Sequence, residues 1–177
     1  FPNDYLDKGD IILQKKVKIN PNDTLGDVYF AKIFPLGVKA CVEAVDLIGS
    51  GNAPRIIQDE SKATYESWCK KFDSKINWSK SGQEIYNLIR GCNPQPGAWA
   101  KIEGNEYIFY DTCFEVNESQ KYLPGKIISI NKDEIAIAVN GGILKVSRMK
   151  SNQGKLYVKE MDTNVFKIGN TFTQPKF

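Results

Sequence analysis

The sequence predicts an α+β fold, and three patterns along the chain lead to this prediction. Apolar residues recur at helical spacing between Leu25 and Ile48, after one short strand. A second, shorter helical pattern follows Ser81. From Ala98 to Val158 the pattern changes to short apolar runs separated by turn residues, which is typical of a small β-barrel or sandwich.

Composition places the chain among ordinary soluble proteins. Its 177 residues are 41% hydrophobic and 25% charged, enough for one domain or for a small domain plus part of another. No apolar run approaches the roughly 18 residues that cross a membrane. No signal-peptide pattern follows Phe1. We therefore expect a cytoplasmic protein with no membrane partner.

The first elements are predicted from apolar spacing and turn residues. Residues Asp10 to Ile19 alternate as a strand does, and Asn20-Pro21-Asn22 predicts a turn. Asp23 or Thr24 can cap the helix that follows. Pro35 interrupts its pattern, so a kink or restart is expected there. The later positions predict one buried helix face that ends at Gly49-Ser50-Gly51; they are Val38, Val42, Val45 and Ile48.

Residues 52–75 carry many charges and little periodicity, which indicates a linker at a domain boundary. The next helix has a capping-box pattern, with Ser79 or Ser81 as the cap and Glu84 three residues after Ser81. Its apolar stripe is Ile85, Leu88 and Ile89, and Gly91 ends it. The predicted strands are Trp99–Ile102, Tyr107–Phe114, Gly125–Ile130, Ile135–Val139 and Ile143–Met149.

The chain has no histidine and four scattered cysteines. This argues against a zinc site, and no metal is expected. Buried thiols in a reducing compartment are the simplest interpretation of Cys41, Cys69, Cys92 and Cys113.

Positive charge gathers between Lys121 and Lys159, where eight basic residues face only Asp133 and Glu134. Such a face can attract a phosphate backbone, although a solvated lysine surface gives the same pattern. Lys145, Arg148 and Lys150 are the candidates for an RNA-facing surface. Trp78 and Trp99 could stack on a base but are expected in the core. Arg90 could contact its helix's last carbonyls or a phosphate, and the first is favoured.

Asp7 is the strongest candidate for chemistry. By itself, a pair of aspartates around Gly9 would be a common loop. The stretch Leu6-Asp7-Lys8-Gly9-Asp10-Ile11-Ile12-Leu13-Gln14, however, resembles the catalytic loop of enzymes that move a formyl group from 10-formyltetrahydrofolate. In that family the aspartate partners an asparagine and a histidine, which would precede Phe1.

Further motifs extend the resemblance over nearly all of the chain. Phe34-Pro35-Leu36-Gly37 and Ala63-Thr64-Tyr65-Glu66 are similar to the hydrolase domain of 10-formyltetrahydrofolate dehydrogenase. Asn93-Pro94-Gln95-Pro96-Gly97-Ala98-Trp99 is closer to methionyl-tRNA formyltransferase. The resemblance implies the C-terminal end of a Rossmann-like catalytic domain at 1–51, a linker at 52–75, and an OB-like β-barrel with a preceding helix at 76–177.

The resemblance also implies a mechanism and a ligand. The histidine and asparagine would stabilise the oxyanion of a tetrahedral intermediate, and Asp7 would hold the histidine in a useful state. Backbone groups at Asp4, Tyr5, Leu6 and Asp7 would contact the folate. Initiator methionyl-tRNA is the favoured acceptor, which would place the protein in one-carbon metabolism and protein biosynthesis. Water is the alternative, and sugar nucleotides fit less well.

Two further interpretations of the chain remain open at this stage. It could be a tRNA-binding barrel without chemistry, or a structural piece that completes a folate-binding domain. If residues 1–50 end a doubly wound sheet, their helix would expose apolar surface and favour self-association.

Overall fold

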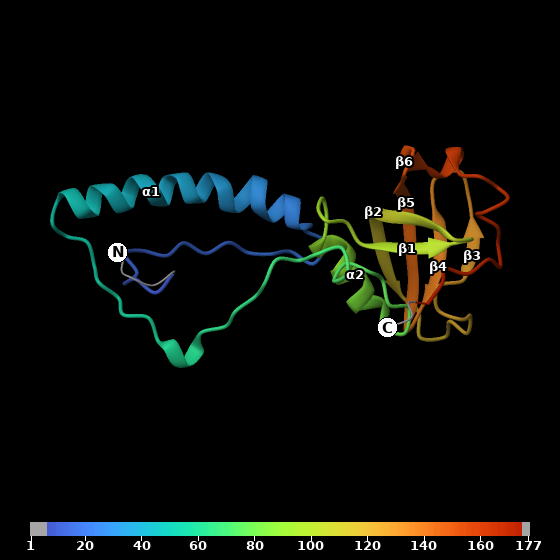
Figure 1. The fold of residues 1–177 in the computed structure, drawn as a ribbon, viewed down its shortest axis with the longest axis horizontal. Coiled ribbons are helices and arrows are strands. Elements are labelled where there is room, and N and C mark those ends of the chain that lie inside the picture. The colour runs from blue at the N-terminus through green and yellow to red at the C-terminus, as the bar shows by residue number, and fades with distance from the viewer. Residues whose placement is uncertain (1–6, 175–177) are drawn as a thin grey trace. The chain divides into compact units, whose positions relative to one another are not determined.

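The computed structural model describes residues 7–174 (Figure 1). The chain divides into two compact units, residues 1–68 and residues 69–177, here called the N-terminal and C-terminal units. Together they form an α+β protein with two α-helices and an antiparallel sheet. Within the described residues, no helix is both long and apolar enough to cross a membrane.

The strand predicted at Asp10–Ile19 is wrong. One antiparallel bridge joins Ile11 to Ile56, whose backbone N–H groups donate to each other's carbonyls at 2.9 and 3.1 Å. Beyond this bridge, residues 13–20 are not part of a sheet. A regular strand needs a neighbour along its whole length to satisfy its backbone groups. In the described part of the N-terminal unit, only the segment around Ile56 supplies one.

The predicted helix forms, and its cap is Thr24. The Thr24 N–H and hydroxyl donate to Asp27 Oδ2 at 2.9 and 2.7 Å, and the Asp27 N–H donates to Thr24 Oγ1 at 3.2 Å. The helical run begins at Leu25, passes through π-helical turns at η1 (Asp27–Ile33) and continues as α1 (Phe34–Gly49).

Pro35 and Gly51 mark the two boundaries of α1 that the sequence predicted. Pro35 lies at the start of α1, where the run changes from π- to α-helical geometry. The expected interruption is therefore a change of helix type. At the other end, Asn52 N–H donates to Leu47 O at 2.9 Å, and Gly51 has a φ of 72°. The glycine-rich helix end is confirmed.

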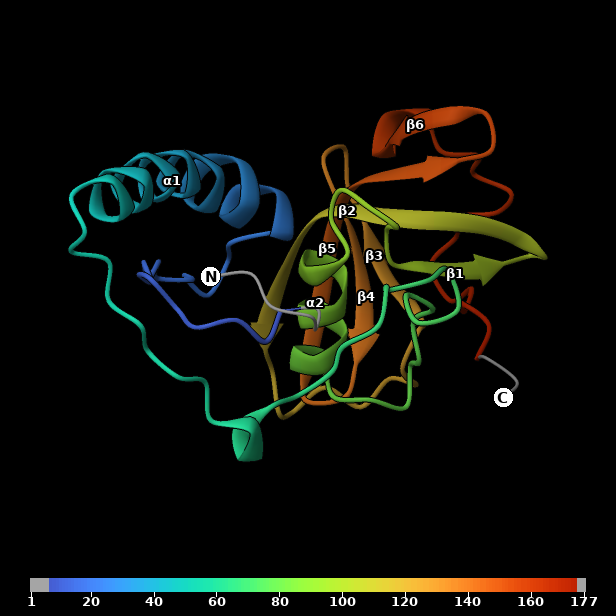
Figure 2. The same ribbon diagram turned by 60° about the vertical axis from the view of Figure 1, so that its left-hand side comes forward.

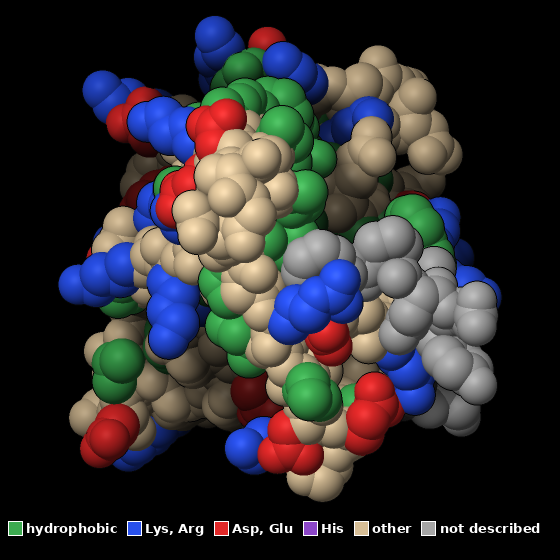
Figure 3. Space-filling view, turned by 90° about the vertical axis from the view of Figure 1, so that its left-hand side faces the viewer, with side chains coloured by type: hydrophobic (Ala, Val, Ile, Leu, Met, Phe, Trp, Pro, Cys, Tyr) green, Lys and Arg blue, Asp and Glu red, His purple; other side chains and the backbone are tan. Residues whose placement is uncertain are grey.

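The apolar face of α1 is exposed, which corrects the prediction of one buried face. Val42 and Val45 are 60% and 66% exposed, and Val38 and Ile48 are exposed as well. Of residues 7–68, Val28 is the only buried side chain. Figure 3 shows a band of hydrophobic side chains at the surface. The helix has the pattern of a core helix, but no described residue of its own unit covers that face.

The C-terminal unit is built on one antiparallel sheet with the strand order β1-β2-β5-β4-β3, and β6 pairs with β5 (Figure 2). The predicted bounds of β1 and β4 are confirmed, β2 and β5 extend further than predicted, and β6 was missed. The strands are β1 (Trp99–Ile102), β2 (Asn105–Val116), β3 (Ile127–Ile130), β4 (Ile135–Val139), β5 (Gly142–Ser151) and β6 (Gly154–Tyr157).

The sheet forms a half-barrel, and a segment near the end of the chain joins its two outer strands, β1 and β3. The Ile127 N–H donates to Asn170 O at 2.8 Å, and the Phe172 N–H donates to Gly125 O at 2.9 Å. On the other edge, the Thr173 N–H donates to Lys101 O at 2.7 Å. Residues 169–173 therefore satisfy backbone groups on the β3 side and the β1 side at once, and Ser74 and Ile76 cover the rest of the β1 edge through their bonds with Trp99.

Three aromatic rings fill the space that this segment closes. Trp78, Phe109 and Phe172 are almost completely buried, with ring centroids 5.3–6.0 Å apart. The expectation that Trp78 lies in the core is confirmed. Gly125 has a φ of 86°, and a Cβ there would lie 3.2 Å from Trp78 Cγ. The chain needs glycine at this position for both its backbone angle and the close approach of the indole.

Helix α2 (Gly82–Gly91) packs against β2 and β5 through buried Ile85, Tyr86 and Ile89. The predicted capping box is confirmed. The Ser81 N–H and hydroxyl donate to Glu84 Oε2 at 3.0 and 2.7 Å, and the Glu84 N–H donates to Ser81 Oγ at 3.2 Å. The Ser81 bonds, together with Lys80, lower the pKa of Glu84 to about 2.

Replacing Phe172 by alanine should lower the free energy of unfolding by about 3–5 kcal/mol, because it removes a fully buried ring and leaves a cavity beside Trp78. Urea unfolding followed by tryptophan fluorescence measures this loss. The matched control is Ile168→Ala in the same segment, where the side chain is 66% exposed and should contribute less than about 0.5 kcal/mol. Equal effects of the two substitutions would contradict the closing role of Phe172.

Ser81→Ala should destabilise the C-terminal unit by about 1 kcal/mol at neutral pH through loss of the cap. The folded pKa of Glu84 lies below its ordinary value of 4.5. Its stabilising contribution is therefore present above pH 4.5 and is lost as the pH falls through about 2. Ser81→Ala should flatten this acid loss between pH 5 and 2, and the exposed-loop variant Ser119→Ala should not. Parallel pH profiles for all three proteins would rule out this role of Glu84.

Candidate functional site

The structure places Asp7 on an exposed turn with its backbone in the left-handed region, at a φ of 58°. Aspartate tolerates this region better than most residues do. The residue is exposed, so a partner group or a ligand could reach it. The other predicted folate-contacting residues, Asp4, Tyr5 and Leu6, lie outside the described residues.

Gln58, which is distant in sequence, holds this turn through its side-chain amide. Its Nε2 donates to the carbonyl oxygens of both Asp7 and Gly9, at 2.8 Å each. The Lys8 ammonium pairs with Glu60 at 2.7 Å, and the Ile11–Ile56 bridge continues the contact. Two stretches about fifty residues apart in the sequence thus meet, and one side chain fixes the backbone on both sides of Lys8.

Sequence reasoning missed Gln58, since it lies in the charged stretch interpreted as a linker. No periodicity or motif there distinguishes it from its neighbours. Its role follows from geometry alone, because a primary amide carries two N–H donors and can satisfy two carbonyls together.

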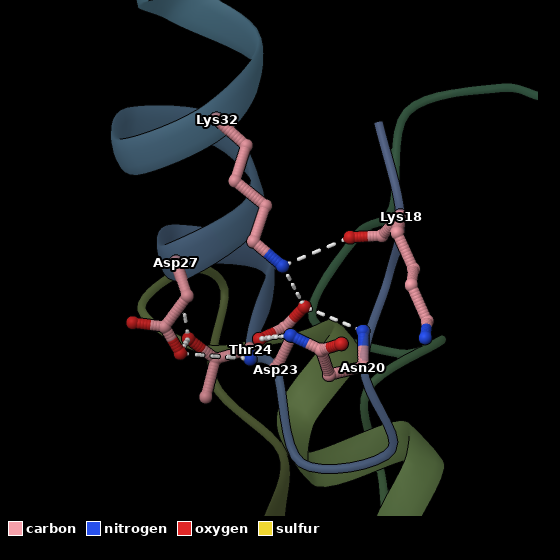
Figure 4. A network of polar contacts seen from close by, with 6 residues as sticks. All are labelled: Lys18, Asn20, Asp23, Thr24, Asp27 and Lys32. Carbon is pink, nitrogen blue, oxygen red and sulfur yellow. Dashed lines mark hydrogen bonds and ion pairs between the residues drawn. The ribbon is translucent and has the colours of Figure 1, made fainter. Parts of the chain in front are cut away.

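A second polar network fixes the turn before the long helix (Figure 4). The Lys32 ammonium binds Asp23 and also donates to Lys18 O at 2.9 Å. The Asn20 N–H donates to Asp23 Oδ2 at 2.6 Å. The Lys32 bond, and after it the Asn20 backbone bond, lowers the pKa of Asp23. Every group in this network serves the turn or the helix start, so we assign it a structural role.

The three basic candidates Lys145, Arg148 and Lys150 lie on one face of β5. Along β5 every second residue is buried as far as Leu144 and Val146, but the next buried residue is Met149, three positions after Val146. The alternation slips by one residue opposite Asp111, which has a φ of 44°. The slip brings all three basic residues to the outer face, although their spacing in a regular strand would divide them.

Carboxylates engage two of these three basic residues. Lys145 pairs with Glu115 at 2.5 Å and Glu134 at 3.7 Å. Arg148 makes two hydrogen bonds to Asp111, at 2.6 and 2.9 Å, and its guanidinium lies 4.8 Å from the Tyr110 ring centroid. The Glu115 bond raises the pKa of Lys145, and the Asp111 bond raises that of Arg148.

These contacts leave a smaller cationic surface than the count of basic residues predicts. Lys150 is exposed, whereas Lys145 and Arg148 would have to exchange internal partners to bind a phosphate. As an RNA-facing cluster the three residues stay a prediction.

The remaining sequence candidates belong to the scaffold. Trp99 is buried, as expected, and its indole N–H donates to Lys71 O at 2.7 Å. The ammonium groups of Lys71 and Lys75 lie 5.2 and 5.4 Å from its ring. Arg90 Nε donates to Asn87 Oδ1 at 2.9 Å, within α2. Among residues 7–174, no cluster of three or more Asp, Glu, Cys or His side chains could hold a metal ion.

The C-terminal unit matches a known protein family. Residues 69–165 match the family model described as formyl transferase, C-terminal domain. The chain is 47% identical over 146 residues to mitochondrial 10-formyltetrahydrofolate dehydrogenase of Homo sapiens, covering 81% of this chain and 16% of that protein. It is 44% identical over 117 residues to the cytosolic 10-formyltetrahydrofolate dehydrogenase of Xenopus laevis, covering 66% and 13%.

A relative of a different name matches over more of the chain. Methionyl-tRNA formyltransferase of Alkaliphilus oremlandii is 34% identical over 165 residues, which cover 93% of this chain and 51% of that protein. The chain therefore spans between 13% and 51% of the length of these relatives.

Two solved structures share the fold. HypX from Aquifex aeolicus, in complex with tetrahydrofolic acid, aligns over 88% of this chain and 28% of its own, with a TM-score of 0.69 at 17% identity. The N-formyltransferase from Helicobacter canadensis, with folinic acid and dTDP-3-aminofucose, covers 88% of this chain and 53% of its own, with a TM-score of 0.59 at 20% identity.

Gln58→Ala should loosen the Asp7 turn without unfolding either unit, because it removes two hydrogen bonds at the surface of the N-terminal unit. The backbone amides of Ile11 and Ile56 should exchange with solvent about tenfold faster. Hydrogen exchange read by mass spectrometry or NMR measures this rate. Ile57→Ala, a truncation of the exposed neighbour, should leave the rate unchanged. Unaltered exchange in Gln58→Ala would show that the amide does not hold the turn.

Proposed function

Because the chain belongs to the formyl transferase family through the C-terminal domain of that family, we propose that it is the C-terminal part of an enzyme that transfers a formyl group from 10-formyltetrahydrofolate. The observation that carries the proposal is Asp7, which stands at the position of the family's catalytic aspartate in the sequence resemblance. The exposure of Asp7 and the two hydrogen bonds from Gln58 that hold its turn support that role.

In the proposed reaction, Asp7 acts on a histidine supplied by the rest of the enzyme. A carboxylate beside an imidazole sets its tautomer and favours its charged form. The histidine and an asparagine would then stabilise the oxyanion that forms as the acceptor attacks the formyl carbon. Since this chain contains no histidine, the proposal assigns it one of the three catalytic groups.

We infer that water is the acceptor, as in the hydrolase domain of 10-formyltetrahydrofolate dehydrogenase. The identities of 44% and 47% to proteins of that name, against 34% for the methionyl-tRNA formyltransferase, support this choice. The pairing of Lys145 and Arg148 with carboxylates supports it as well, because RNA binding needs cations available to phosphates.

Methionyl-tRNA is the second candidate, favoured by the Asn93-to-Trp99 motif and by the alignment over 93% of this chain. In this alternative, exposed Lys150 would contact RNA, and Lys145 and Arg148 would join it by exchanging partners.

The domain boundaries remain part of the proposal. Residues 1–51 would complete a Rossmann-like catalytic domain, 52–75 would link it onward, and 76–177 would form an OB-like barrel. The contacts of Ile56, Gln58 and Glu60 with the Asp7 turn extend the catalytic part into the predicted linker. The cytoplasm stays the predicted location, although the relatives' names include both cytosolic and mitochondrial proteins.

A chimaera tests activity and acceptor together. This chain would replace the matching half of the Alkaliphilus oremlandii protein, and the product would be assayed for formate release and for formylated methionyl-tRNA. We expect the chimaera to release formate when no tRNA is present. Asp7→Asn should lower the rate of formate release by about 100-fold or more. Asp46→Asn, the same change on the exposed part of α1, is the control.

The outcomes separate the parts of this proposal. An active chimaera that is insensitive to Asp7→Asn would refute the catalytic role. Formylated tRNA without formate release, lowered by Lys150→Ala, would select the second candidate. A chimaera that folds, as judged by circular dichroism, but shows neither product would refute formyl transfer.

The exposed face of α1 should also drive association between copies of the isolated chain, as the sequence predicted. Light scattering should show a mass that rises with concentration, since Val42 and Val45 project apolar surface into water. The double variant Val42→Lys, Val45→Lys should be monomeric. Ile57→Lys, at an exposed apolar residue outside the helix, should still associate. A wild-type chain that is monomeric at all concentrations would contradict the prediction.

A further inference from the structure

Two of the four cysteines meet in the C-terminal unit. The Cys69 and Cys92 sulfur atoms lie 3.9 Å apart, although the residues are 23 positions apart in sequence. The expectation of scattered buried thiols is therefore wrong in two respects. Cys92 is buried but Cys41, Cys69 and Cys113 are exposed, and one exposed thiol touches the buried one.

Cys92 is held firmly. It follows the last residue of α2, where its N–H donates to Leu88 O at 3.0 Å and its carbonyl accepts from the Gly97 N–H at 2.9 Å. Its side chain is 4% exposed and belongs to the hydrophobic core. Burial, and after it the neighbouring Cys69, raises the pKa of its thiol to about 12.

Cys69 is the more adaptable partner. It is the first residue of the C-terminal unit and lies outside regular secondary structure. The turn after it is fixed, since the Lys70 N–H donates to Asp73 Oδ2 at 2.8 Å and the Asp73 N–H donates to Lys70 O at 3.0 Å. Forming a disulfide requires the two sulfurs to approach by about 2 Å. Rotation of the Cys69 side chain and a small shift of its backbone can supply that movement.

We propose that Cys69 and Cys92 form a redox-reactive thiol pair that a hydroperoxide converts to an intramolecular disulfide. Cys69, which solvent reaches, attacks the peroxide oxygen. The O–O bond breaks, and Cys69 becomes a sulfenic acid as the other oxygen leaves as water. The Cys92 sulfur then attacks the Cys69 sulfur, the S–O bond breaks, and a second water leaves with the Cys92 proton. Two thiols are oxidised, and one hydrogen peroxide is reduced to two waters.

The positions of the two thiols give this bond a structural consequence. It closes the loop from Cys69 to Cys92, which contains the segment from Lys70 to Ser81 and all of α2. It also anchors the first residue of the C-terminal unit to the end of that helix. A cross-link over a loop of this length restricts the unfolded chain and stabilises the unit. Oxidation would thus tighten the place where the chain enters its packed core.

Peptide mapping of the full chain tests the proposal. The reduced protein is treated with hydrogen peroxide, free thiols are blocked, and trypsin digestion is done without reductant. Cleavage after Lys62, Lys70, Arg90 and Lys101 releases peptides 63–70 and 91–101, which contain Cys69 and Cys92 in turn. We expect these two peptides joined, at the summed mass less two hydrogen atoms, and separated again by dithiothreitol. The melting temperature should rise by about 5 °C or more on oxidation.

Two variants complete the experiment. Cys69→Ser changes an exposed side chain, so it should fold normally, lack the linked peptides and show no rise in melting temperature with peroxide. The double variant Cys41→Ser, Cys113→Ser removes the other two exposed thiols and should keep both responses. Linked peptides that contain Cys41 or Cys113 in place of the expected pair would overturn the proposal. So would Cys69 oxidised to sulfinic acid beside an unmodified Cys92.

Discussion

Closure of the half-barrel is the interaction on which the C-terminal unit depends. Its sheet ends at β1 on one edge and β3 on the other, and residues 169–173 hydrogen-bond to Lys101 on the first side and to Gly125 and Ile127 on the second. The same segment carries Phe172 into contact with Trp78 and Phe109. Backbone satisfaction and apolar burial thus come from one stretch near the end of the chain. Because open edges and an unfilled core would both be costly, the sheet needs this segment to be complete.

The two units differ in how much of their apolar sequence they use. In the C-terminal unit nearly every inward strand position is buried, and α2 adds Ile85, Tyr86 and Ile89. In the described part of the N-terminal unit, hydrogen bonds and ion pairs do most of the organising, through Gln58, Lys32 and the Thr24 cap. A helix with an apolar stripe but no cover gains little from the hydrophobic effect. We infer that the N-terminal unit is the less stable of the two when the chain is isolated.

Acidic side chains pair with part of the basic surface of the C-terminal unit, and this bears on RNA binding. The sequence between Lys121 and Lys159 is strongly basic, yet acidic side chains from β2 and from the residue before β4 meet Lys145 and Arg148 on the outer face of β5. The local slip opposite Asp111 aligns these partners. The count of basic residues therefore overstates the surface available to RNA, whereas Asp7 is exposed on a turn that Gln58 and the Lys8–Glu60 ion pair hold. The proposed chemistry rests on that turn.

The sequence by itself determined the features that depend on neighbours along the chain. Interactions between nearby residues explain each of these features. They are the Ser81–Glu84 capping box, the Thr24 cap, the helix change at Pro35, the glycine-rich end of α1 and the bounds of β1 and β4. Trp78 and Trp99 were also predictable as core residues, because large apolar rings among apolar neighbours are buried in most folds.

Only the tertiary structure decided the features that depend on distant residues. Whether Asp10–Ile19 became a strand depended on a pairing partner, and whether α1 was buried depended on a covering surface. Gln58 reached Asp7, Glu115 reached Lys145 and Cys69 reached Cys92 across 51, 30 and 23 positions. Local spacing encodes backbone geometry and the side of an element on which a residue lies. It does not encode which remote side chain arrives there, because that is set by how the whole chain packs.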